Sequence, residues 1–490
     1  MDFQQWWGSV PASITVGVTI LDMAIRLAAL GIVPHNRRPA AALGWLTVIF
    51  FMPVIGLVLF LLFGTSTLGK RRRTLEQHVP EQHLPAGTLQ GESTVVDALP
   101  EWARAMVRMN ESNGGLPVTT GNSADLLPDY EASIDAMTEA VRQAVSFVHV
   151  EFYIAVSDDT TEPLFHALEE AHHRGVQVRV LLDHVGSAGF PGYKAATRRL
   201  DGAGIAWRLM LPVASPRFHY QRPDLRNHRK VLVIDNRVGF TGSQNIIDAS
   251  YNKKANKRRG LQWRDLMVRI EGPAVPQLNA VFRADWTAET NEDIPDNAPP
   301  ITGPPPGHLS CQILPSGPGN TNESNLRLFL AMIYNARDQV TICSPYFVPD
   351  ESLLLAVTSA VQRGVEVRLL MGSTSDHFLT HHAQRSYYEM LLAAGVAIHL
   401  YPEPFVLHSK FVVIDGQVSV VASSNMDIRS FALNQEVNLL VLDADFARRL
   451  DAVTDEYLDE THELQTDRWN GRPLHAKFLD NACRLTANLQ

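Results

Sequence analysis

The sequence of 490 residues carries 43 Lys+Arg against 52 Asp+Glu, a formal charge of -9, and 45% of its residues are hydrophobic. This length allows about three domains of roughly 150 residues, and the composition excludes a disordered or fibrous chain. Net acidity argues against a nucleic-acid partner, because a basic surface supplies most of that affinity. The three cysteines, Cys311, Cys343 and Cys483, lie far apart, which disfavours a disulfide framework or a Cys-rich zinc site and fits a reducing compartment.

Two apolar stretches lie near the N-terminus. Residues 14–33 are interrupted only by Asp22 and Arg26, which lie four positions apart and can pair on one helix face. Residues 40–63 run for 24 residues without a charge, enough at ~1.5 Å per residue to cross a hydrocarbon layer of ~30 Å. Pro53 is expected to kink this second helix. We therefore predict a transmembrane helix pair within residues 1–73.

Positive charges flank these stretches. Arg37 and Arg38 lie in the short connection between them, and residues 70–73 read Lys-Arg-Arg-Arg. If both stretches span, the N-terminus and the large remainder share the side with four positive charges, so we expect the catalytic region on the cytoplasmic side of the cell (inner) membrane. The basic collar at 70–73 is suited to anionic lipid headgroups. The first ten residues carry no Lys or Arg, which disfavours a signal peptide.

The remaining chain is a duplication. Residues 74–116 form a predicted linker with one helix near 102–109, and the Pro-rich segment 291–308 is a second linker between half 1 (117–290) and half 2 (309–490). Four segments recur in the same order: 149–154 and 342–348, 174–182 and 363–370, 203–206 and 394–397, 228–235 and 408–415. Strands alternate with helices in both halves, which predicts an α/β fold of two tandem halves around one pseudo-two-fold active site.

Both halves contain the motif His-x-Lys-x-x-x-x-Asp. Its members are His228, Lys230 and Asp235 in half 1, and His408, Lys410 and Asp415 in half 2. On a strand, residues two apart project from the same face, so the imidazole and the ammonium converge on one anion. The Asp completes the predicted catalytic set, but its strand parity and its position in an expected turn assign it a structural role first.

A small-residue turn and an Asn follow each motif. The turns are Gly242-Ser243-Gln244-Asn245 and Ala422-Ser423-Ser424-Asn425. Paired His, Lys and Asn side chains suit phosphoryl transfer without a metal or another cofactor. One His attacks phosphorus, the other protonates the leaving oxygen, and Lys, Asn and Ser bind the non-bridging oxygens. We therefore expect Asn245, Asn425, Ser243 and Ser423 to bind substrate.

These paired motifs resemble those of the phospholipase D superfamily. The segments 226–230, 263–265, 425–430 and 434–438, with the N-terminal helix pair, further resemble bacterial cardiolipin synthases. The resemblance implies transfer of a phosphatidyl group between two phosphatidylglycerol molecules, giving cardiolipin and glycerol through a phosphohistidine.

The same resemblance assigns roles to individual residues. It makes His228 and His408 nucleophile and general acid/base; which is which stays open, with His228 favoured as nucleophile. Asp265 and Glu436 follow the His of their own half by 37 and 28 residues and resemble the carboxylates that orient the imidazoles. Ala422 stands where the family usually has Gly, and its methyl group would crowd a turn with positive φ.

Two alternative functions remain. A phospholipase D would pass the phosphatidyl group to water or to another alcohol, and an inactive membrane scaffold would show no turnover. A phosphodiesterase acting on nucleic acid is disfavoured by the acidic catalytic region and the membrane anchor.

Several other groups invite a functional interpretation: the basic run 253–259, the histidines His377, His381 and His382, the His-x-Lys at His475, and the strand ends Glu151 and Tyr346. The basic run fits lipid recruitment or a solvated loop equally well. The three histidines have metal-like spacing but no indicated carboxylate or Cys partner, which favours a surface helix. The segment at His475 fits an amphipathic helix outside the site. Glu151 and Tyr346 fit either a cleft lining or the edge of the core.

Overall fold

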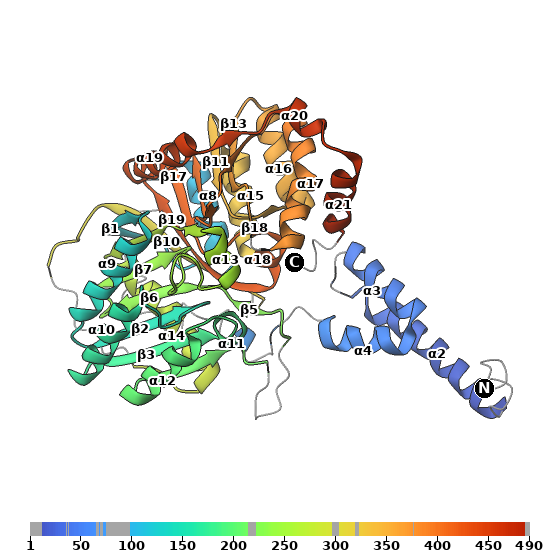
Figure 1. Ribbon diagram of the computed structural model, residues 1–490, viewed down its shortest axis with the longest axis horizontal. Coiled ribbons are helices and arrows are strands. Elements are labelled where there is room, and N and C mark those ends of the chain that lie inside the picture. The colour runs from blue at the N-terminus through green and yellow to red at the C-terminus, as the bar shows by residue number, and fades with distance from the viewer. Residues whose placement is uncertain are drawn as a thin grey trace. The chain divides into compact units, whose positions relative to one another are not determined.

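The computed structural model describes residues 12–35, 37, 39–64, 68, 72–74, 99–213, 222–295, 303–318, 323–375 and 377–485. The chain divides into two compact units, Met1–Thr67 and Leu68–Gln490. The described part of the first unit is helical, and the second unit is an α/β structure built on one large sheet (Figure 1).

The first unit contains helices α2 (Ala12–Ile32), α3 (Pro39–Phe51) and α4 (Pro53–Phe63). Asp22 and Arg26 form the predicted pair on α2, at 3.0 Å. The predicted break at Pro53 is confirmed: Met52 leaves the helical conformation, with φ -138° and ψ 73°, because proline cannot follow a helical residue without a clash. Within the described residues α2 is the single helix long and apolar enough to cross a membrane. A second span over 40–63 is therefore not confirmed.

The described residues of half 1 form nine strands and six helices. The strands are β1 (Thr119–Leu127), β2 (Phe147–Phe152), β3 (Gln177–Asp183), β4 (Ala206–Met210), β5 (Arg226–Asn227), β6 (Lys230–Ile234), β7 (Val238–Gly242), β8 (Gln262–Arg264) and β9 (Met267–Glu271). The helices are α9 (Tyr130–Arg142), α10 (Glu162–His173), α11 (His184–Ala188), α12 (Tyr193–Ala203), α13 (Lys254–Arg259) and α14 (Ala274–Thr290).

Half 2 follows with the corresponding elements. Its strands are β10 (Leu309–Ser316), β11 (Gln339–Cys343), β12 (Phe347–Val348), β13 (Glu366–Gly372), β14 (Ala397–Tyr401), β15 (Phe405–Leu407), β16 (Phe411–Ile414), β17 (Val418–Ala422), β18 (Met426–Asp427), β19 (Asn434–Leu442) and β20 (His462–Glu463). Its helices are α15 (Ser324–Asn335), α16 (Glu351–Gln362), α17 (Phe378–Ala394), α18 (Ile428–Ala432), α19 (Ala444–Glu460), α20 (Thr466–Asn470) and α21 (Leu474–Arg484).

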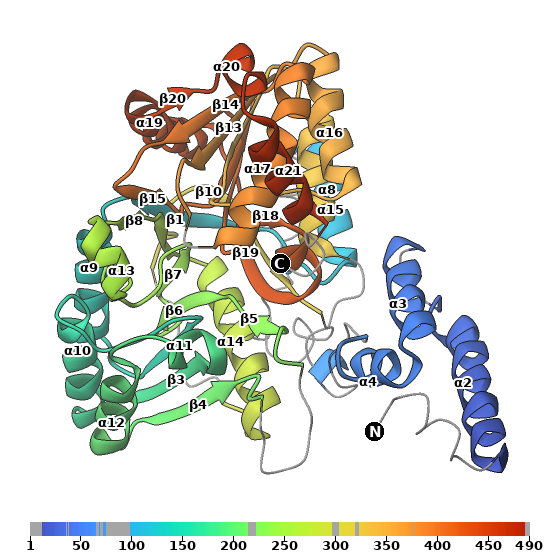
Figure 2. The same cartoon turned by 45° about the vertical axis from the view of Figure 1, so that its right-hand side comes forward.

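The strand order shows the duplication directly. Half 1 reads β1-β9-β7-β6-β2-β3-β4, and half 2 reads β10-β19-β17-β16-β11-β13-β14 with β20 added at its edge. The two orders are related by a pseudo-two-fold axis at the antiparallel pair β1–β10, where Thr119 lies opposite Cys311. The predicted α/β class with two tandem halves is thus confirmed. The halves form one continuous sheet, which Figure 2 shows from a second direction.

Helices cover both faces of this sheet. On β6, Leu232 and Ile234 pack in the cluster that contains residues of α9 and α10, whereas Val231 and Val233 pack in the cluster of α14 and α19. Neighbouring strand residues face opposite sides, so a strand covered on both faces is apolar throughout. The His-x-Lys segment of each half is thereby fixed to the rigid centre of the sheet.

The end of the first predicted linker contributes to the second unit. Residues 102–109 lie in the helix α8 (Glu101–Ser112), as expected, but its Met106 belongs to the core of half 2, and Asn110 Nδ2 donates to Gln312 Oε1 at 2.9 Å. The end of the predicted linker 74–116 is therefore packed structure, because α8 is amphipathic and needs a partner for its apolar face. We retain 117–290 and 309–490 as the proposed halves.

The basic collar also differs from its prediction where it is described. Arg72 is 7% exposed and forms ion pairs with Asp285 and Glu289 of α14. Its Nη2 also donates to Gln435 Oε1 at 3.2 Å. This guanidinium is thus anchored inside the second unit and does not face lipid. Lys70 and Arg71 lie outside the described residues.

Candidate active site

Each motif His is attached to a strand of the other half. His228 follows β5, and its backbone N–H donates to Gln435 O of β19 at 2.8 Å. His408 follows β15, and its backbone N–H donates to Arg264 O of β8 at 2.7 Å. These contacts continue the short ladders β5–β19 and β8–β15. Each imidazole is consequently fixed at the contact between the halves.

The carboxylates also cross between the halves. His228 Nδ1 lies 3.0 Å from Glu436 Oε2, and His408 Nδ1 lies 2.6 Å from Asp265 Oδ1. Each carboxylate therefore contacts the His of the other half, a pairing that distance along the chain does not indicate. The crossing follows from the ladders, because β19 carries Glu436 past β5, and Asp265 follows β8 beside β15. With Nδ1 turned to a carboxylate, Nε2 is the ring nitrogen left for chemistry.

The two motif serines bind these carboxylates. Ser243 Oγ donates to Asp265 Oδ1 at 2.6 Å, and Ser423 Oγ donates to Glu436 Oε2 at 2.6 Å. Both serines are fully buried. Each hydroxyl thus positions the carboxylate that contacts a His, and substrate binding by the two serines stays a prediction.

The two lysines have equivalent surroundings. Lys230 Nζ donates to His228 O and Lys410 Nζ donates to His408 O, each at 2.7 Å. Burial lowers the pKa of Lys230 to about 7 and that of Lys410 to about 8. The ammonium groups also act across the pseudo-two-fold axis, because Lys410 lowers the pKa of Lys230. The two motifs thus share one electrostatic environment.

The imidazoles are buried in the same environment. His228 and His408 are 8% and 7% exposed. Burial lowers the pKa of both rings, that of His228 to about 4, and in each case the neighbouring carboxylate opposes the shift. Lys410 lowers the pKa of His228 further, and Lys230 that of His408. The His228 ring is therefore neutral at pH 7, the state that a nucleophile requires.

The two motif asparagines differ. Asn245 accepts a hydrogen bond from Ile154 N at 3.2 Å and donates to Tyr251 Oη at 2.9 Å. Asn425 Oδ1 is buried and has no hydrogen-bond partner among the described residues. The amide of Asn245 is thus held by the protein, whereas the carbonyl oxygen of Asn425 is left for a donor from outside it.

The motif aspartates lie away from the imidazoles. Asp235 accepts hydrogen bonds from the backbone N–H groups of residues 145–147, each at 2.8 Å. Asp415 accepts from those of residues 337–339 at 3.0, 2.9 and 2.8 Å. Their φ angles of 54° and 51° place both in tight turns. These contacts agree with the structural role expected for both aspartates, and their place in the catalytic set stays a prediction.

The Gly/Ala difference between the turns has a backbone explanation. Gly242 has φ +150°, and a Cβ atom there would lie 2.3 Å from Leu266 O. Ala422 has a negative φ, and its N–H donates to Lys410 O at 2.9 Å. The methyl group of Ala422 therefore does not crowd the second turn.

Substitutions at Gly242 and at Ala422 should differ in their effects on stability and activity. We expect Gly242→Ala to destabilise the protein by ~1–3 kcal/mol and to reduce activity, because the new methyl group displaces the Leu266 carbonyl beside Asp265. Ala422→Gly should cost ~1 kcal/mol or less, since it only loosens the strand. Thermal unfolding and turnover of both variants test this, and equal losses would contradict it.

The sequence patterns did not indicate two aromatic residues of the site. The Tyr153 ring lies 5.0 Å from the His228 ring and 5.5 Å from Lys230 Nζ. It occupies the repeat position of Tyr346, so aligning the halves residue by residue would have found it. The Tyr251 ring lies 6.3 Å from the His408 ring. Of the predicted strand ends, Glu151 is fully buried and accepts from Asn227 Nδ2 at 3.0 Å, so it does not line an open surface.

The other histidine signals have structural explanations. His382 Nδ1 lies 2.7 Å from Asp480 Oδ1, which joins α17 to α21. No group of three metal-ligating side chains occurs among the described residues. His475 is exposed on α21, as its expected amphipathic helix requires.

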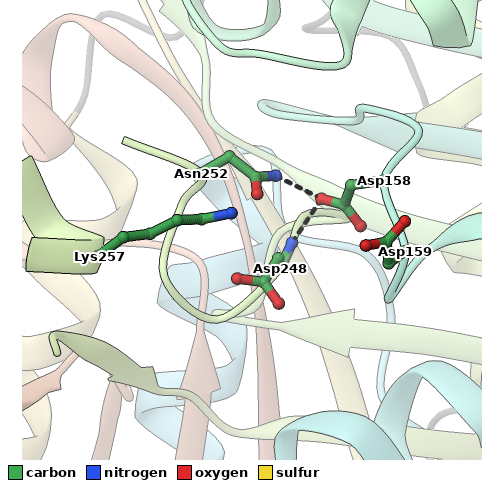
Figure 3. A pocket seen from close by; sticks show the side chains of 5 residues that line it. All are labelled: Asp158, Asp159, Asp248, Asn252 and Lys257. Carbon is green, nitrogen blue, oxygen red and sulfur yellow. Dashed lines mark hydrogen bonds between the residues drawn. The ribbon is translucent and has the colours of Figure 1, made fainter. Parts of the chain in front are cut away.

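The basic run 253–259 is mostly the helix α13 and not a loop. Arg259 pairs with Glu403, and Lys257 lines a small polar pocket with Asp158 and Asp248 (Figure 3). Asp158 Oδ2 accepts from Asp248 N at 2.8 Å and from Asn252 Nδ2 at 2.6 Å. This cluster holds the loop that follows Asn245 and carries Tyr251.

The fold and the buried centre together define a two-half phospholipase D-like protein. A solved structure with a similar fold is phosphatidylserine synthase from Haemophilus influenzae Rd KW20, with a TM-score of 0.60 at 14% identity over 80% of this chain and 100% of that chain. The family model described as "Cardiolipin synthase, PLD-like domain" matches residues 137–286 and 329–458, and "Phospholipase_D-nuclease N-terminal" matches 23–64.

Curated relatives specify the family. Cardiolipin synthase A from Proteus mirabilis (strain HI4320) is 33% identical over 466 residues, covering 92% of this chain and 93% of the relative. Cardiolipin synthase A from Pectobacterium carotovorum subsp. carotovorum (strain PC1) is 34% identical over 458 residues with the same coverage. The chain belongs to the cardiolipin synthase family. Together with the apolar helix α2, the N-terminal match identifies a membrane protein.

Proposed function

We propose that this protein is a cardiolipin synthase, a phosphatidyltransferase that converts two phosphatidylglycerol molecules into cardiolipin and glycerol. The observation that carries the proposal is the crossed arrangement, in which each half supplies a His and the carboxylate that contacts the other His. Such a centre places two imidazoles at one phosphorus atom, one as the nucleophile and one as the general acid/base. The named relatives along 92% of the chain support the same activity.

In the first step His228 Nε2 attacks the phosphorus of one phosphatidylglycerol. The bond from phosphorus to the glycerol headgroup oxygen breaks, and His408 donates a proton to that oxygen as glycerol leaves. A phosphatidyl group is then bonded to His228. The lowered pKa of His228, about 4 through burial, keeps its ring unprotonated for this attack. Glu436 at Nδ1 orients the ring and stabilises the positive charge that the new P–N bond creates.

In the second step His408, now neutral, removes the proton from a headgroup hydroxyl of the second phosphatidylglycerol. That oxygen attacks phosphorus, the P–N bond breaks, and cardiolipin leaves with both histidines restored. The short contact of 2.6 Å between His408 and Asp265 favours the protonated ring, which suits a general acid/base. Over the whole cycle His408 regains the proton that it donates, and the phosphatidyl group passes from the first lipid to the second.

Lys230 and Lys410 would stabilise the phosphate in both steps. Their ammonium groups supply donors for the non-bridging oxygens and Asn425 Oδ1 accepts from a headgroup hydroxyl, so the proposal includes no metal and no other cofactor. Asn245 would act by holding Tyr251 beside His408.

The lysine pKa values predict an alkaline limit to activity. Burial lowers the pKa of Lys230 to about 7 and of Lys410 to about 8, so both ammonium groups lose their protons as pH rises through this range. The lowered pKa of His228, about 4, makes kcat/KM rise with pH on the acid side. We expect a bell-shaped profile of kcat/KM with its maximum below pH 7, because His408, whose pKa is lowered from 6.5 by burial, must also be protonated in the first step. Activity that keeps rising to pH 9.5, in protein shown to stay folded, would contradict this.

We further propose that the second unit works at the cytoplasmic face of the cell membrane. Six Lys and Arg residues lie after α2, at 37, 38 and 70–73, and residues 1–11 carry none. Positive residues remain on the cytoplasmic side. No nucleic-acid partner is proposed.

One assay tests the function. Purified protein in liposomes receives labelled phosphatidylglycerol with EDTA and without CTP, and lipid products and free glycerol are quantified. Cardiolipin and glycerol in equal amounts support the proposal. Phosphatidic acid as the single lipid product would show that the protein is a hydrolytic phospholipase D. No turnover in folded protein would show that it is a scaffold.

A further inference from the structure

The two ends of the apolar stretch 39–64 lie together. Arg37, just before α3, donates from Nη2 to Gly64 O at 2.8 Å and from Nε to the same oxygen at 3.2 Å. Its guanidinium carbon also lies 4.7 Å from the Phe60 ring centre. The chain therefore returns after α4 to the place where it entered α3. A continuous helix of this length would separate its two ends by ~36 Å.

The chain reverses its direction at a tight bend between α3 and α4. A Cβ atom on Gly56 would lie 2.7 Å from Ile49 Cα, so the first turn of α4 packs directly on the last turn of α3. The residues at the bend are apolar and outward-facing: Phe51 is 84% exposed and Met52 is 51% exposed. An exposed apolar tip between two apolar helices is suited to hydrocarbon.

The pair α3–α4 reaches only part of the way along α2. At its base, Ala42 and Phe60 pack with Val33 at the end of α2. At its tip, the Phe50 ring lies 5.8 Å from the guanidinium carbon of Arg26. Arg26 is six residues before the last residue of α2, Ile32, or ~9 Å along the helix axis. The tip thus lies about a third of the way along α2 from its C-terminal end.

The backbone at the bend is suited to this depth. Pro53 has no N–H group, Met52 N donates to Val48 O at 2.9 Å, and Gly56 N donates to Met52 O at 2.6 Å. Non-helical backbone within a membrane requires such internal partners. An apolar pocket of about 330 Å³, lined by Ile25, Leu57 and other apolar side chains, separates α2 from α4 and suits a lipid acyl chain.

We propose that α2 alone crosses the membrane and that α3 and α4 form a re-entrant hairpin in the leaflet on the side of the second unit. The segment before α2 then lies on the opposite side of the membrane from residues 68–490. This replaces the two-span topology expected from hydropathy.

The charges agree with this topology. With two spans, Arg37 and Arg38 lie opposite the four positive residues 70–73. With a re-entrant hairpin, all six lie on one side, and residues 1–11 on the other side carry no Lys or Arg. The second distribution follows the positive-inside rule without exception.

Cysteine labelling separates the two topologies. The native cysteines are buried, so the unaltered protein is the background control. Single variants Ser9→Cys, His35→Cys and Thr74→Cys are treated with a membrane-impermeant maleimide in intact spheroplasts and in inside-out vesicles. We expect His35→Cys and Thr74→Cys to be labelled from the same side, in inside-out vesicles, and Ser9→Cys from the other side, in spheroplasts.

Each other outcome has a defined meaning. Labelling of Ser9→Cys with Thr74→Cys on one side, and of His35→Cys on the other, would establish two spans and overturn the proposal. Labelling of His35→Cys and Thr74→Cys in spheroplasts would support the hairpin but refute the cytoplasmic placement. The cardiolipin assay is independent of all three results.

A matched pair of glycines tests the bend itself. Gly56→Leu should push α4 from α3, whereas a Cβ on Gly44 of α3 meets nothing within 4 Å, so Gly44→Leu is the control. We expect the pair Val33→Cys and Phe60→Cys, which is buried in one cluster, to form a disulfide with iodine in the unaltered hairpin and with Gly44→Leu, and at least tenfold less with Gly56→Leu. No cross-link in the unaltered hairpin, or equal cross-linking with both glycine variants, would overturn the packed bend.

Discussion

Replacing His228 or His408 by alanine is expected to reduce cardiolipin formation by at least ~10³-fold, because each ring is needed in both steps of the proposed cycle. The measurement is kcat with labelled phosphatidylglycerol in liposomes. His475→Ala is the matched control, since His475 has the same His-x-Lys spacing but lies exposed on α21. Activity near the unaltered level in either site variant would refute the mechanism.

An activated donor would separate the roles of the two histidines. In a p-nitrophenyl ester of phosphatidic acid the leaving group departs without a proton, so the general acid is not required. We expect His408→Ala to release one equivalent of p-nitrophenol in a burst and to retain a phosphatidyl group on the peptide that contains His228. His228→Ala should give no burst. A burst from His228→Ala instead would make His408 the nucleophile.

Neutralising the carboxylates should have effects that cross between the halves. Glu436→Gln removes the charge next to His228 and should slow the burst with the activated donor by ~10²–10⁴-fold. Asp265→Asn removes the charge next to His408 and should leave the burst rate nearly unchanged while slowing turnover of phosphatidylglycerol by a similar factor. Burst kinetics and steady-state kcat measured on the same preparations give both numbers.

The opposite pattern would refute this assignment. If Asp265→Asn slowed the burst and Glu436→Gln spared it, each carboxylate would serve the His of its own half. Glu463→Gln, a change at an exposed position on β20, is the control for loss of a surface charge. Ser243→Ala and Ser423→Ala should reproduce the effects of Asp265→Asn and Glu436→Gln in weaker form, about tenfold, because each removes one hydrogen bond to a carboxylate.

Much of the fold and of the site is encoded locally. The α/β class follows from alternating helix and strand patterns, and the duplication follows from four recurring segments. The position of Asp235 in a turn follows from the residues that come directly after its strand. The break at Pro53 follows from proline itself. Each of these properties depends on residues close in sequence, so spacing is enough to predict them.

The tertiary structure decided which groups meet. Glu436 lies 208 residues from His228, and the contact exists because β19 runs beside β5. Spacing within one half does not indicate this partner, since it contains no information about how two halves pair. The same holds for the serines, whose hydroxyls look available in the sequence but are buried against carboxylates.

The apolar stretch 40–63 likewise has one property that its sequence determines and another that only its tertiary contacts determine. Its length and lack of charge establish an affinity for hydrocarbon, and the sequence alone determines that affinity. Whether the stretch crosses or returns depends on contacts between its two ends, Arg37 with Gly64, and at its bend, Gly56 with Ile49. Hydropathy is a sum over residues and contains no information about the direction of the chain, whereas packing and hydrogen bonding determine the path that the chain takes.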